Sequence, residues 1–392
     1  MPGEGAAVPT MRALLVSENF PPRIGGSARW LWELYRRLPR ADVTVAAGSC
    51  PGDAAFDRGH DLRVARLPLS FPDLGVLSPP IWLHYRRAAR TLRAHARRDA
   101  VQVLHCGRVL PEGWLALACA RPFACYVHGE ELISNATSRQ LTWMAAHVMR
   151  RAAVLIANSR HTAELLQRRW GVEVTRIAVL TPGVDTARFA PAPRDEATRA
   201  ALGWAGRTVV LTVARLQKRK GHDRMIDAVE LLRTRFPTLL YAVVGDGEER
   251  AALEQRVRRA GLGAHVRFHG AVDDTELLRI YQQCDLFALP NRTADGDFEG
   301  FGMVLLEAQA CGRAVLTGDS GGTAEAVCAG ETGVIVDCTQ AEPLANAVAA
   351  LLQDGGWRER MGAAGRRWVE AGFDFDGGAP RAAAVLARVA AP

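Results

Sequence analysis

The chain has 392 residues, of which 48% are hydrophobic and 23% are charged. This composition excludes wholesale disorder, and the length predicts two domains rather than a single core. The formal net charge of +7 suits anionic ligands such as phosphates or lipid headgroups, but the positive residues are too scattered to predict a nucleic-acid partner.

The first half of the chain alternates short apolar runs with helical patterns. Continuous apolar strands, separated by helices, are typical of a parallel sheet that helices cover on both faces. We therefore predict an α/β, doubly wound domain. Its expected strands are residues 12–18, 42–48, 62–69, 101–106, 123–129 and 153–159, and helices are expected at 27–38, 81–98 and 139–151.

The alternation stops at residues 181–207, which are rich in proline, alanine and charge, and then resumes. We predict two Rossmann-like domains facing across a cleft, with boundaries 1–190 and 191–375. Residues 376–392 are expected to form a terminal helix, and its packing against the first domain stays open. Such sheets bind ligands at the carboxyl ends of their strands, so we expect the site in the cleft. The strands expected after the break are 208–216, 239–247, 265–272, 285–290, 314–319 and 332–337.

The loop after the first expected strand contains Gly25 and Gly26, directly ahead of a helix. The free N–H groups of a helix N-terminus can meet an anion, and glycines let a phosphate approach the backbone. The alternative is an ordinary tight turn, and paired glycines alone do not decide between the two.

Two further loops follow expected strands and carry candidate residues. In "VARLQKRKG", Arg215 and Lys220 lie where phosphates would sit, whereas we interpret Lys218 and Arg219 as solvated neighbours. Taken alone, such a basic loop is more often plain surface. In "YVHGEEL", His128 ends a strand; a lone histidine is usually structural, but the two carboxylates that follow favour a function.

The stretch "FEGFGMVLLEAQACG" places Glu299 and Glu307 eight residues apart around an apolar, helix-like run. That spacing predicts one shared helix face, with the amides of Phe301, Gly302 and Met303 pointing at a ligand. A carboxylate is costly to bury without hydrogen-bond donors, and a vicinal diol supplies two. We therefore interpret Glu299 as a sugar contact and Glu307 as a ribose contact. The alternative is that Glu307 pairs with a basic core residue.

Together these motifs resemble one family, the retaining glycosyltransferases of two-Rossmann (GT-B) architecture and family 4 type. This group includes bacterial α-mannosyltransferases and sucrose synthase. The stretch "EGFGMVLLE" matches its E-x7-E signature, and the resemblance covers nearly the whole chain. Other family-like segments are "VARLQKRKG", "VVGDGEER", "NSRHTAELL", "TPGVDTARF", "IYQQCDLFALP" and "EAQACG" followed by "SGGTAEAV".

The resemblance implies that the second domain binds a nucleotide-sugar donor and the first binds the acceptor. Arg215 and Lys220 then correspond to a diphosphate pair that stabilises the leaving nucleotide electrostatically. Gly25 and Gly26 correspond to a glycine loop that closes over the diphosphate, and Gly245 in "VVGDGEER" is assigned to the donor site.

The resemblance also assigns the residues around the sugar. Glu307 corresponds to the ribose contact, and Glu299 with the amides of residues 301–304, ending at Val304, to a clamp on the donor sugar. His128 corresponds to a histidine that contacts the donor sugar near the reacting carbon. Such enzymes retain the anomeric configuration by same-face attack of the acceptor, with the leaving phosphate as base, so no separate nucleophile is expected.

The segments "HGEE", "EAQACG" and "SGGTAE" are most similar to those of family members that use GDP-mannose to mannosylate inositol phospholipids. We therefore expect transfer of a hexose, mannose first among the candidates, to a hydroxyl of a lipid-linked or small-molecule glycoside. Three alternatives stay open: a UDP-sugar donor with a different acceptor, a GT-B epimerase or phosphorylase, and a sensor that binds the donor without turnover.

Asp295 and Asp297 in "TADGDFEG" have the D-x-D spacing with which metal-dependent glycosyltransferases of another fold hold a divalent cation. Because Arg215 and Lys220 already counter a diphosphate, we expect no metal and no cofactor, the nucleotide sugar being a co-substrate. We interpret the loop around the two aspartates as solvated and lid-like.

The chain has eight cysteines without a CxxC pair, no apolar stretch near the roughly 18 residues of a membrane span, and no visible signal peptide. We therefore expect a cytoplasmic protein. The helix expected at residues 84–98 either attracts an anionic membrane, making the protein peripheral to its inner face, or is merely a solvated basic helix. Five arginines share one face of that helix: Arg86, Arg87, Arg90, Arg93 and Arg97.

Overall fold

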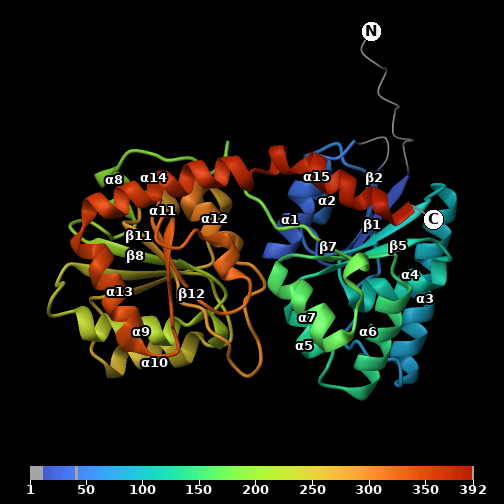
Figure 1. Cartoon of the computed structure of the whole chain (residues 1–392), viewed down its shortest axis with the longest axis horizontal. Coiled ribbons are helices and arrows are strands. Elements are labelled where there is room, and N and C mark those ends of the chain that lie inside the picture. Colours follow the sequence, from blue (N-terminus) through green and yellow to red (C-terminus); the bar gives the residue numbers. More distant parts are fainter. Residues whose placement is uncertain (1–11, 40–42, 391–392) are drawn as a thin grey trace, which may run out of the picture. The chain divides into compact units, whose positions relative to one another are not determined.

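The structure, a computed structural model, describes residues 12–39 and 43–390 and forms two compact units (Figure 1). The first unit holds the described residues up to Asn158, then Thr162–Leu180 and the residues from Ala379 onward. The second holds Ser159–His161 and Thr181–Gly378. Each unit contains one parallel sheet with helices, which confirms the predicted fold class. The roles of acceptor and donor domain stay predictions.

The first unit is built on a seven-stranded sheet in the order β3-β2-β1-β4-β5-β6-β7. The strand order reverses between β1 and β4, where doubly wound sheets open a ligand crevice at their carboxyl edge. Burial on both faces explains the unbroken apolar sequences of the central strands. The strands are β1 (Ala13–Ser17), β2 (Val43–Gly48), β3 (Val64–Leu67), β4 (Val103–Cys106), β5 (Phe123–Val127), β6 (Val154–Ala157) and β7 (Ile177–Val179).

The helices of the first unit confirm the three that were expected, with small shifts at their ends. In α3, the buried side chains recur every three or four residues and the arginines lie on the other faces, as in an amphipathic helix. The α-helices are α1 (Gly26–Tyr35), α2 (Asp53–Arg58), α3 (Pro79–Arg98), α4 (Trp114–Ala116), α5 (Glu130–Ser134), α6 (Arg139–Arg151) and α7 (Arg160–Trp170), and shorter turns are η1 (Val109–Gly113), η2 (Leu117–Cys119), η3 (Val174–Arg176) and η6 (Arg388–Ala390).

The second unit repeats this plan with a six-stranded parallel sheet in the order β10-β9-β8-β11-β12-β13. Its order reverses between β8 and β11, so the loops after these two strands meet at the carboxyl edge. All six strands that were expected after the break are confirmed. They are β8 (Thr208–Val213), β9 (Leu239–Val244), β10 (Val266–Gly270), β11 (Leu286–Leu289), β12 (Val315–Gly318) and β13 (Gly333–Val336).

The helices of the second unit pack against the sheet through two apolar clusters, which contain the buried residues of α9, α12 and α13. Helix α15 begins in the second unit and ends in the first, where Arg388 donates to the carbonyl of Thr175 at 2.8 Å. The helices are α8 (Glu196–Ala201), α9 (His222–Leu232), α10 (Arg250–Arg259), α11 (Asp274–Gln283), α12 (Met303–Ala310), α13 (Ala341–Gln353), α14 (Gly355–Gly372) and α15 (Phe375–Ala387), with the turns η4 (Lys218–Lys220) and η5 (Thr323–Ala326).

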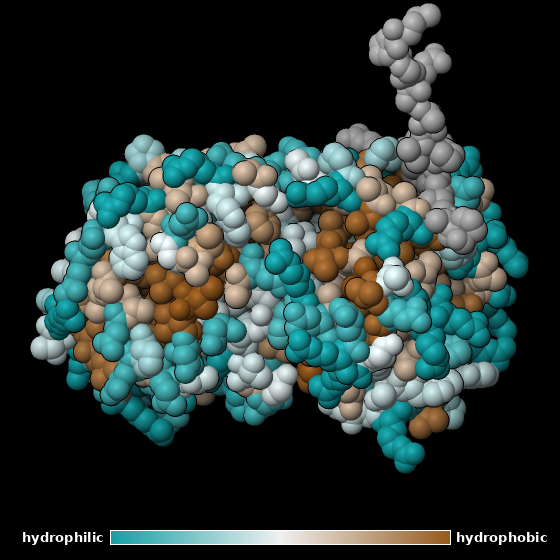
Figure 2. All heavy atoms as spheres, in the orientation of Figure 1, coloured by the Kyte–Doolittle hydropathy of each residue, from teal (hydrophilic) through white to brown (hydrophobic). Residues whose placement is uncertain are grey.

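Among the described residues, no helix combines the length and the apolar character that crossing a bilayer requires. Hydrophilic residues cover most of the face drawn in Figure 2, with hydrophobic residues gathered in patches between them.

Candidate active site

The first candidate residues follow β8 at the carboxyl edge of the second sheet. The chain leaves the strand through Arg215 and enters the turn η4, which ends at Lys220. Arg215 is exposed, and its side chain has no side-chain partner within the described parts of the chain. The Lys220 side chain is only 12% exposed and forms an ion pair with Glu299. The two cations that were predicted to meet a diphosphate therefore lie in one loop. Arg215 is open to solvent, and Lys220 is paired with Glu299.

The predicted helix around Glu299 begins later than expected. Helix α12 starts at Met303, because Gly302 adopts a positive φ of 87° and caps the helix. Glu299 therefore lies in the non-helical segment before the helix, and the prediction of one shared helix face is wrong. Glu307 lies about one turn into α12 and is 6% exposed.

A phenol on a neighbouring helix helps to hold the Glu307 carboxylate. The hydroxyl of Tyr281 on α11 donates to Glu307 Oε2 at 2.7 Å. Burial, and then the nearby Glu307 carboxylate, raises the pKa of Tyr281 well above its ordinary value, so the phenol keeps its proton and remains a donor. The sequence did not single out Tyr281, although the segment "IYQQCDLFALP" contains it.

Glu299 is a nearly buried carboxylate that two cations keep ionised. Its side chain is 14% exposed and accepts hydrogen bonds from Arg219, at 2.6 Å, and from Lys220. Burial pushes the pKa of Glu299 upward, but the attraction of Lys220 and Arg219 outweighs burial and holds the pKa below its ordinary value. Glu299 is thus a charged acceptor at neutral pH.

Arg219 is the main correction to the predicted loop. It was interpreted as solvated, yet its side chain is only 6% exposed, and it lies 2.9 Å from Asp297 as well as bonding Glu299. Lys218 is exposed as predicted and lies 3.2 Å from Asp295. Both aspartates of the D-x-D motif therefore face cationic side chains. Among the described residues, no group of three or more histidine, cysteine, aspartate or glutamate residues is placed to hold a metal.

Glycines let the loop after β12 support the Glu299 segment. A Cβ atom on Gly321, at φ +73°, would lie 2.0 Å from the carbonyl oxygen of Glu299, and one on Gly322 would lie 2.1 Å from that of Gly300. The N–H of Gly322 donates to the Glu299 carbonyl at 2.9 Å. Gly245 has a similar packing reason, since its Cβ would lie 2.1 Å from the oxygen of Ala214. The donor contact of Gly245 stays a prediction.

The predicted amides lie where α12 begins. Phe301 is buried in the core at 2% exposure, and Gly302 precedes the first turn, which contains Met303 and Val304. No side chain caps this helix N-terminus, so its first N–H groups are of the kind that donate hydrogen bonds to an anion or a sugar oxygen.

In the first unit, His128 follows β5 and is fixed by three contacts. Its Nε2 lies 2.8 Å from the carbonyl oxygen of Gly107, and its backbone N–H donates to Glu131 at 2.8 Å. The ring meets Trp30 edge-on, with 5.6 Å between centroids. Because a carbonyl only accepts, Nε2 carries a proton, which leaves Nδ1 as the acceptor of the neutral ring.

Gly25 and Gly26 lie at the start of α1, as predicted. The helix has no side-chain cap, and a Cβ atom on Gly25 would meet nothing within 4 Å. Packing within the first unit therefore does not require glycine at position 25. The role of both glycines against a diphosphate stays a prediction.

A polar cluster after β1 and β4 escaped the sequence analysis. Glu112 is fully buried, accepts a hydrogen bond from the N–H of Glu18 at 2.9 Å, and lies 3.5 Å from Arg108. Arg108 and Arg23 both bind Glu18, at 3.0 and 3.1 Å. The cluster joins residues far apart in sequence, so no local pattern reveals it.

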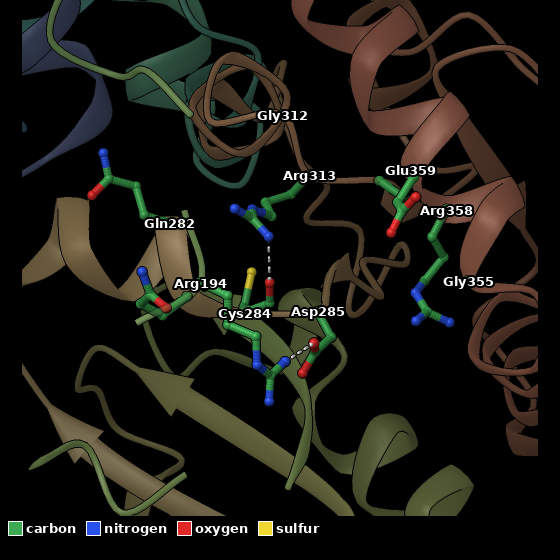
Figure 3. A pocket seen from close by; sticks show the side chains of 11 residues that line it. Arg194, Gln282, Cys284, Asp285, Gly312, Arg313, Gly355, Arg358 and Glu359 are labelled. Atoms are coloured by element: carbon green, nitrogen blue, oxygen red, sulfur yellow. Dashed lines mark hydrogen bonds and ion pairs between the residues drawn. The ribbon is translucent and has the colours of Figure 1, made fainter. Parts of the chain in front are cut away.

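A pocket of about 220 Å³ lies at the opposite end of the second sheet, before β11 and β12 (Figure 3). Three arginines line it, but each already serves the fold. Arg194 binds Asp285 at 3.0 Å, Arg313 donates to the carbonyl of Cys284 at 3.1 Å, and Arg358 donates to carbonyls at the end of α13. We therefore do not assign the donor to this pocket.

Known proteins resemble the chain across both units. Residues 24–188 match the model described as Glycosyltransferase Family 4, and residues 194–368 match that of Glycosyl transferases group 1.

Two curated relatives share a name, GDP-mannose-dependent alpha-(1-6)-phosphatidylinositol monomannoside mannosyltransferase. That of Mycolicibacterium smegmatis is 34% identical over 371 residues, 91% of this chain and 93% of the relative. That of Mycobacterium tuberculosis is 34% identical over 382 residues, 93% of this chain and 95% of the relative.

A solved structure, Anabaena Alr3699/HepE in complex with UDP and glucose, superposes with a TM-score of 0.81 at 22% identity, covering 96% of this chain and 99% of the other. This likeness concerns the fold. The family models and the relatives show more: the chain belongs to the family 4 group of retaining GT-B glycosyltransferases.

Proposed function

We propose that the enzyme transfers mannose from GDP-mannose to a hydroxyl of a phosphatidylinositol mannoside, with retention of configuration and without a metal. The observation that carries the donor and the acceptor is 34% identity, over 91% of the chain, to a mannosyltransferase of that name. The side chains at the carboxyl edges of the two sheets support the chemistry.

The leaving GDP is stabilised by Arg215 and Lys220. The exposed guanidinium of Arg215 offers a fork that matches phosphate oxygens, and the ammonium of Lys220 offers a compact charge. As the bond between the sugar and the phosphate breaks, negative charge grows on the diphosphate, and both cations stabilise it more strongly than in the ground state. Because these cations supply the counter-charge, no divalent ion is needed for it.

Two carboxylates bind hydroxyl groups of the donor. Tyr281 orients Glu307, and a carboxylate accepts several hydrogen bonds at once, so Glu307 can also meet the ribose diol. The ionised Glu299 accepts from a hydroxyl of the mannose, next to the free amides at the start of α12.

His128 contributes an acceptor on the first unit. With Nε2 donating to the carbonyl of Gly107, Nδ1 is the ring nitrogen left to meet a sugar hydroxyl. The acceptor hydroxyl attacks the anomeric carbon from the face that the phosphate leaves, and its proton passes to that phosphate. Its oxygen forms the new glycosidic bond, so the reaction needs no protein nucleophile.

We further propose that α3 contacts the anionic membrane that carries the lipid acceptor. Leu77, 81% exposed, precedes the helix, and Trp82 and Leu83 near its start are 46% and 39% exposed. The guanidinium of Arg86 lies over the Trp82 ring, 4.5 Å from its centroid. Exposed aromatic and aliphatic residues beside a row of arginines are typical of a helix at a membrane surface.

Co-sedimentation with vesicles tests this contact. Arg86→Gln with Arg90→Gln removes two charges from α3, and each basic residue near an anionic surface contributes about 1 kcal/mol. We therefore expect binding to phosphatidylinositol-containing vesicles to weaken by about 30-fold. Arg258→Gln with Arg259→Gln removes equal charge from α10 and should bind as the wild type does. Equal losses in both double variants would contradict a role for α3.

Thermal shifts in EDTA test the donor. A ligand at 100 times its Kd stabilises a protein by about 2.7 kcal/mol, so the preferred base should stand out among GDP, UDP and ADP. We expect GDP and GDP-mannose to raise Tm most. A shift with UDP alone would leave the family assignment intact and overturn the choice of donor.

A further inference from the structure

The loop between β11 and α12 meets the turn η4 through a series of ion pairs. Lys218, Arg219 and Lys220 follow one another in η4, and they face carboxylates at alternate positions of the other segment. The pairs are Lys218 with Asp295, Arg219 with Asp297 and Glu299, and Lys220 with Glu299. The two segments lie about 80 residues apart in sequence yet match charge for charge.

A tight turn in the backbone sets the spacing of the carboxylates. Ala294 and Asp297 exchange backbone hydrogen bonds at 2.9 and 2.8 Å, and Asp295 and Gly296 between them both have positive φ, 52° and 80°. Positive φ at both central residues is what a type I′ turn requires, and Asp-Gly is a favoured pair for it. The turn places Asp295 at the tip and directs the chain from Asp297 toward Glu299.

The start of the same loop is also fixed to the basic turn. Arg292 forms a two-fold bond with Asp223 at the start of α9, at 2.8 and 2.9 Å. Its backbone N–H donates to the carbonyl of Arg219 at 2.8 Å. Arg219 therefore holds the loop through its backbone as well as through its side chain.

Exposure separates these pairs into an outer and an inner set. Lys218 and Asp295 are 61% and 80% exposed, and such pairs contribute little. Arg219 is 6% exposed and shares oxygen Oε2 of Glu299 with Lys220. The inner set comprises Arg219, Lys220, Glu299 and Asp297, of which Asp297 is the most exposed at 45%. We call it the Glu299 ion-pair cluster. Its two positive and two negative charges cancel.

Binding of a donor would change the balance of charges in this cluster. On the proposed function, Lys220 turns to the diphosphate, which would leave Glu299 buried with one cation fewer. Arg219 can remain paired with Glu299, because its guanidinium group is also paired with Asp297. We propose that Arg219 is a positioning residue, which keeps Glu299 ionised and aimed at the donor sugar while Lys220 is drawn to the diphosphate. Asp297 of the D-x-D motif then serves an internal arginine, while Asp295 faces Lys218, rather than the two holding a cation from solution.

The proposal can be tested without any donor, by replacing Lys220 to mimic its withdrawal. The charged side chains facing Glu299 are Arg219 and Lys220 from η4, with Asp297 bound to the same arginine. In Lys220→Met, we expect the Glu299 carboxyl, followed by ¹³C NMR and assigned with Glu299→Gln, to titrate near or below the usual glutamate value of about 4.3. In Lys220→Met with Arg219→Gln, burial acts unopposed and the pKa should rise clearly above that value.

A second experiment measures catalysis and distinguishes a positioning role of Arg219 from a purely structural one. In Arg219→Gln, Kd for GDP should stay within about twofold, while kcat with GDP-mannose falls at least about tenfold. The acid limb of the kcat/KM profile should move to higher pH, since Glu299 must be ionised, and Arg219→Lys should recover part of the loss. A purely structural role would lower Tm without moving the acid limb.

The outcomes distinguish this proposal from the proposed function. If the wild type does not use GDP-mannose, the donor assignment fails, while the NMR titration still decides the role of Arg219. If the double variant titrates as Lys220→Met does, Arg219 does not hold Glu299 ionised and the proposal is overturned. A loss of GDP binding in Arg219→Gln as large as the loss of turnover would make Arg219 a phosphate contact instead. Lys218→Gln, at the exposed outer pair, is the matched control and should keep wild-type values.

Discussion

Glu307 is a carboxylate at 6% exposure that accepts a hydrogen bond from the phenol of Tyr281. A buried charge is costly unless hydrogen bonds or opposite charges compensate it. The Glu299 side chain is 14% exposed and pairs with two cations. The two carboxylates therefore differ in the partners that the structure shows: a phenol donates to Glu307, whereas two cations pair with the ionised Glu299.

The roles proposed for Glu307 and His128 predict separable effects of two substitutions. Glu307→Ala should weaken GDP binding by about tenfold or more, because the bonds of a charged group to the ribose are lost. His128→Ala should leave GDP binding unchanged and lower kcat, because His128 is assigned to the sugar. Calorimetric titration with GDP and steady-state kinetics measure the two effects. Equal loss of GDP binding in both variants would refute the roles assigned to them.

Gly321 is a residue for which backbone geometry alone makes a prediction. Its φ of +73° disfavours a side chain, and a Cβ would lie 2.0 Å from the carbonyl oxygen of Glu299. We expect Gly321→Ala to lower the free energy of unfolding by at least about 2 kcal/mol and to reduce activity. Gly330, at φ +82° with nothing within 4 Å, is the matched control. Gly330→Ala should cost only about 1 kcal/mol of conformational strain. Urea denaturation that gave both variants the same loss would show that the close approach has no effect.

At the scale of elements, periodicity predicted most strands and the helices α1, α3 and α6 of the first half, whereas α7 was not among the expected helices. The run 123–129 became β5, and the pattern at 139–151 became α6 with the same ends. The three residues of β7 were missed because so short a run gives no strand pattern. The start of α12 was misplaced because the conformation of Gly302 follows from the loops packed around it.

The candidate site was predictable as a set of residues but not as a set of pairs. Arg215, Lys220, Glu299 and Glu307 were identified through their positions after strands and through the family resemblance. The burial of Arg219 could not be read from its neighbours, because its partners lie about 80 residues further along the chain. Long-range pairing of this kind leaves no local pattern in a single sequence.

The surroundings of Glu112 in the turn η1 predict how much stability the protein loses when this buried carboxylate is removed. Glu112 in η1 is fully buried, accepts from the N–H of Glu18 and lies near Arg108. Glu112→Ala would leave Arg108 with one partner fewer and the N–H of Glu18 without its acceptor. We expect the free energy of unfolding of the enzyme to fall by about 3 kcal/mol or more.

An exposed pair supplies the control for this prediction. Glu164 lies 3.3 Å from Arg168 on α7, with 54% and 79% of their side chains exposed. Glu164→Ala should change stability by about 0.5 kcal/mol or less. If chemical denaturation gave similar values for Glu112→Ala and Glu164→Ala, the buried cluster would contribute no more than a surface pair.

At the scale of the whole molecule, both units place polar side chains at the carboxyl edge of a parallel sheet, next to the point where strand order reverses. The second unit presents Arg215, Lys220, Glu299 and Glu307, which suit a nucleotide sugar. The first presents His128 and the cluster around Glu18. On the proposed function, transfer uses both sets, so each unit alone should lack activity.

The most direct test is transfer from GDP-mannose to a phosphatidylinositol mannoside in EDTA, with the anomeric configuration of the product read by NMR. The account predicts a new α-mannoside, formed with retention from the α-linked donor and undiminished by removal of divalent ions. A β-mannoside, or turnover that EDTA abolishes and a divalent cation restores, would contradict it.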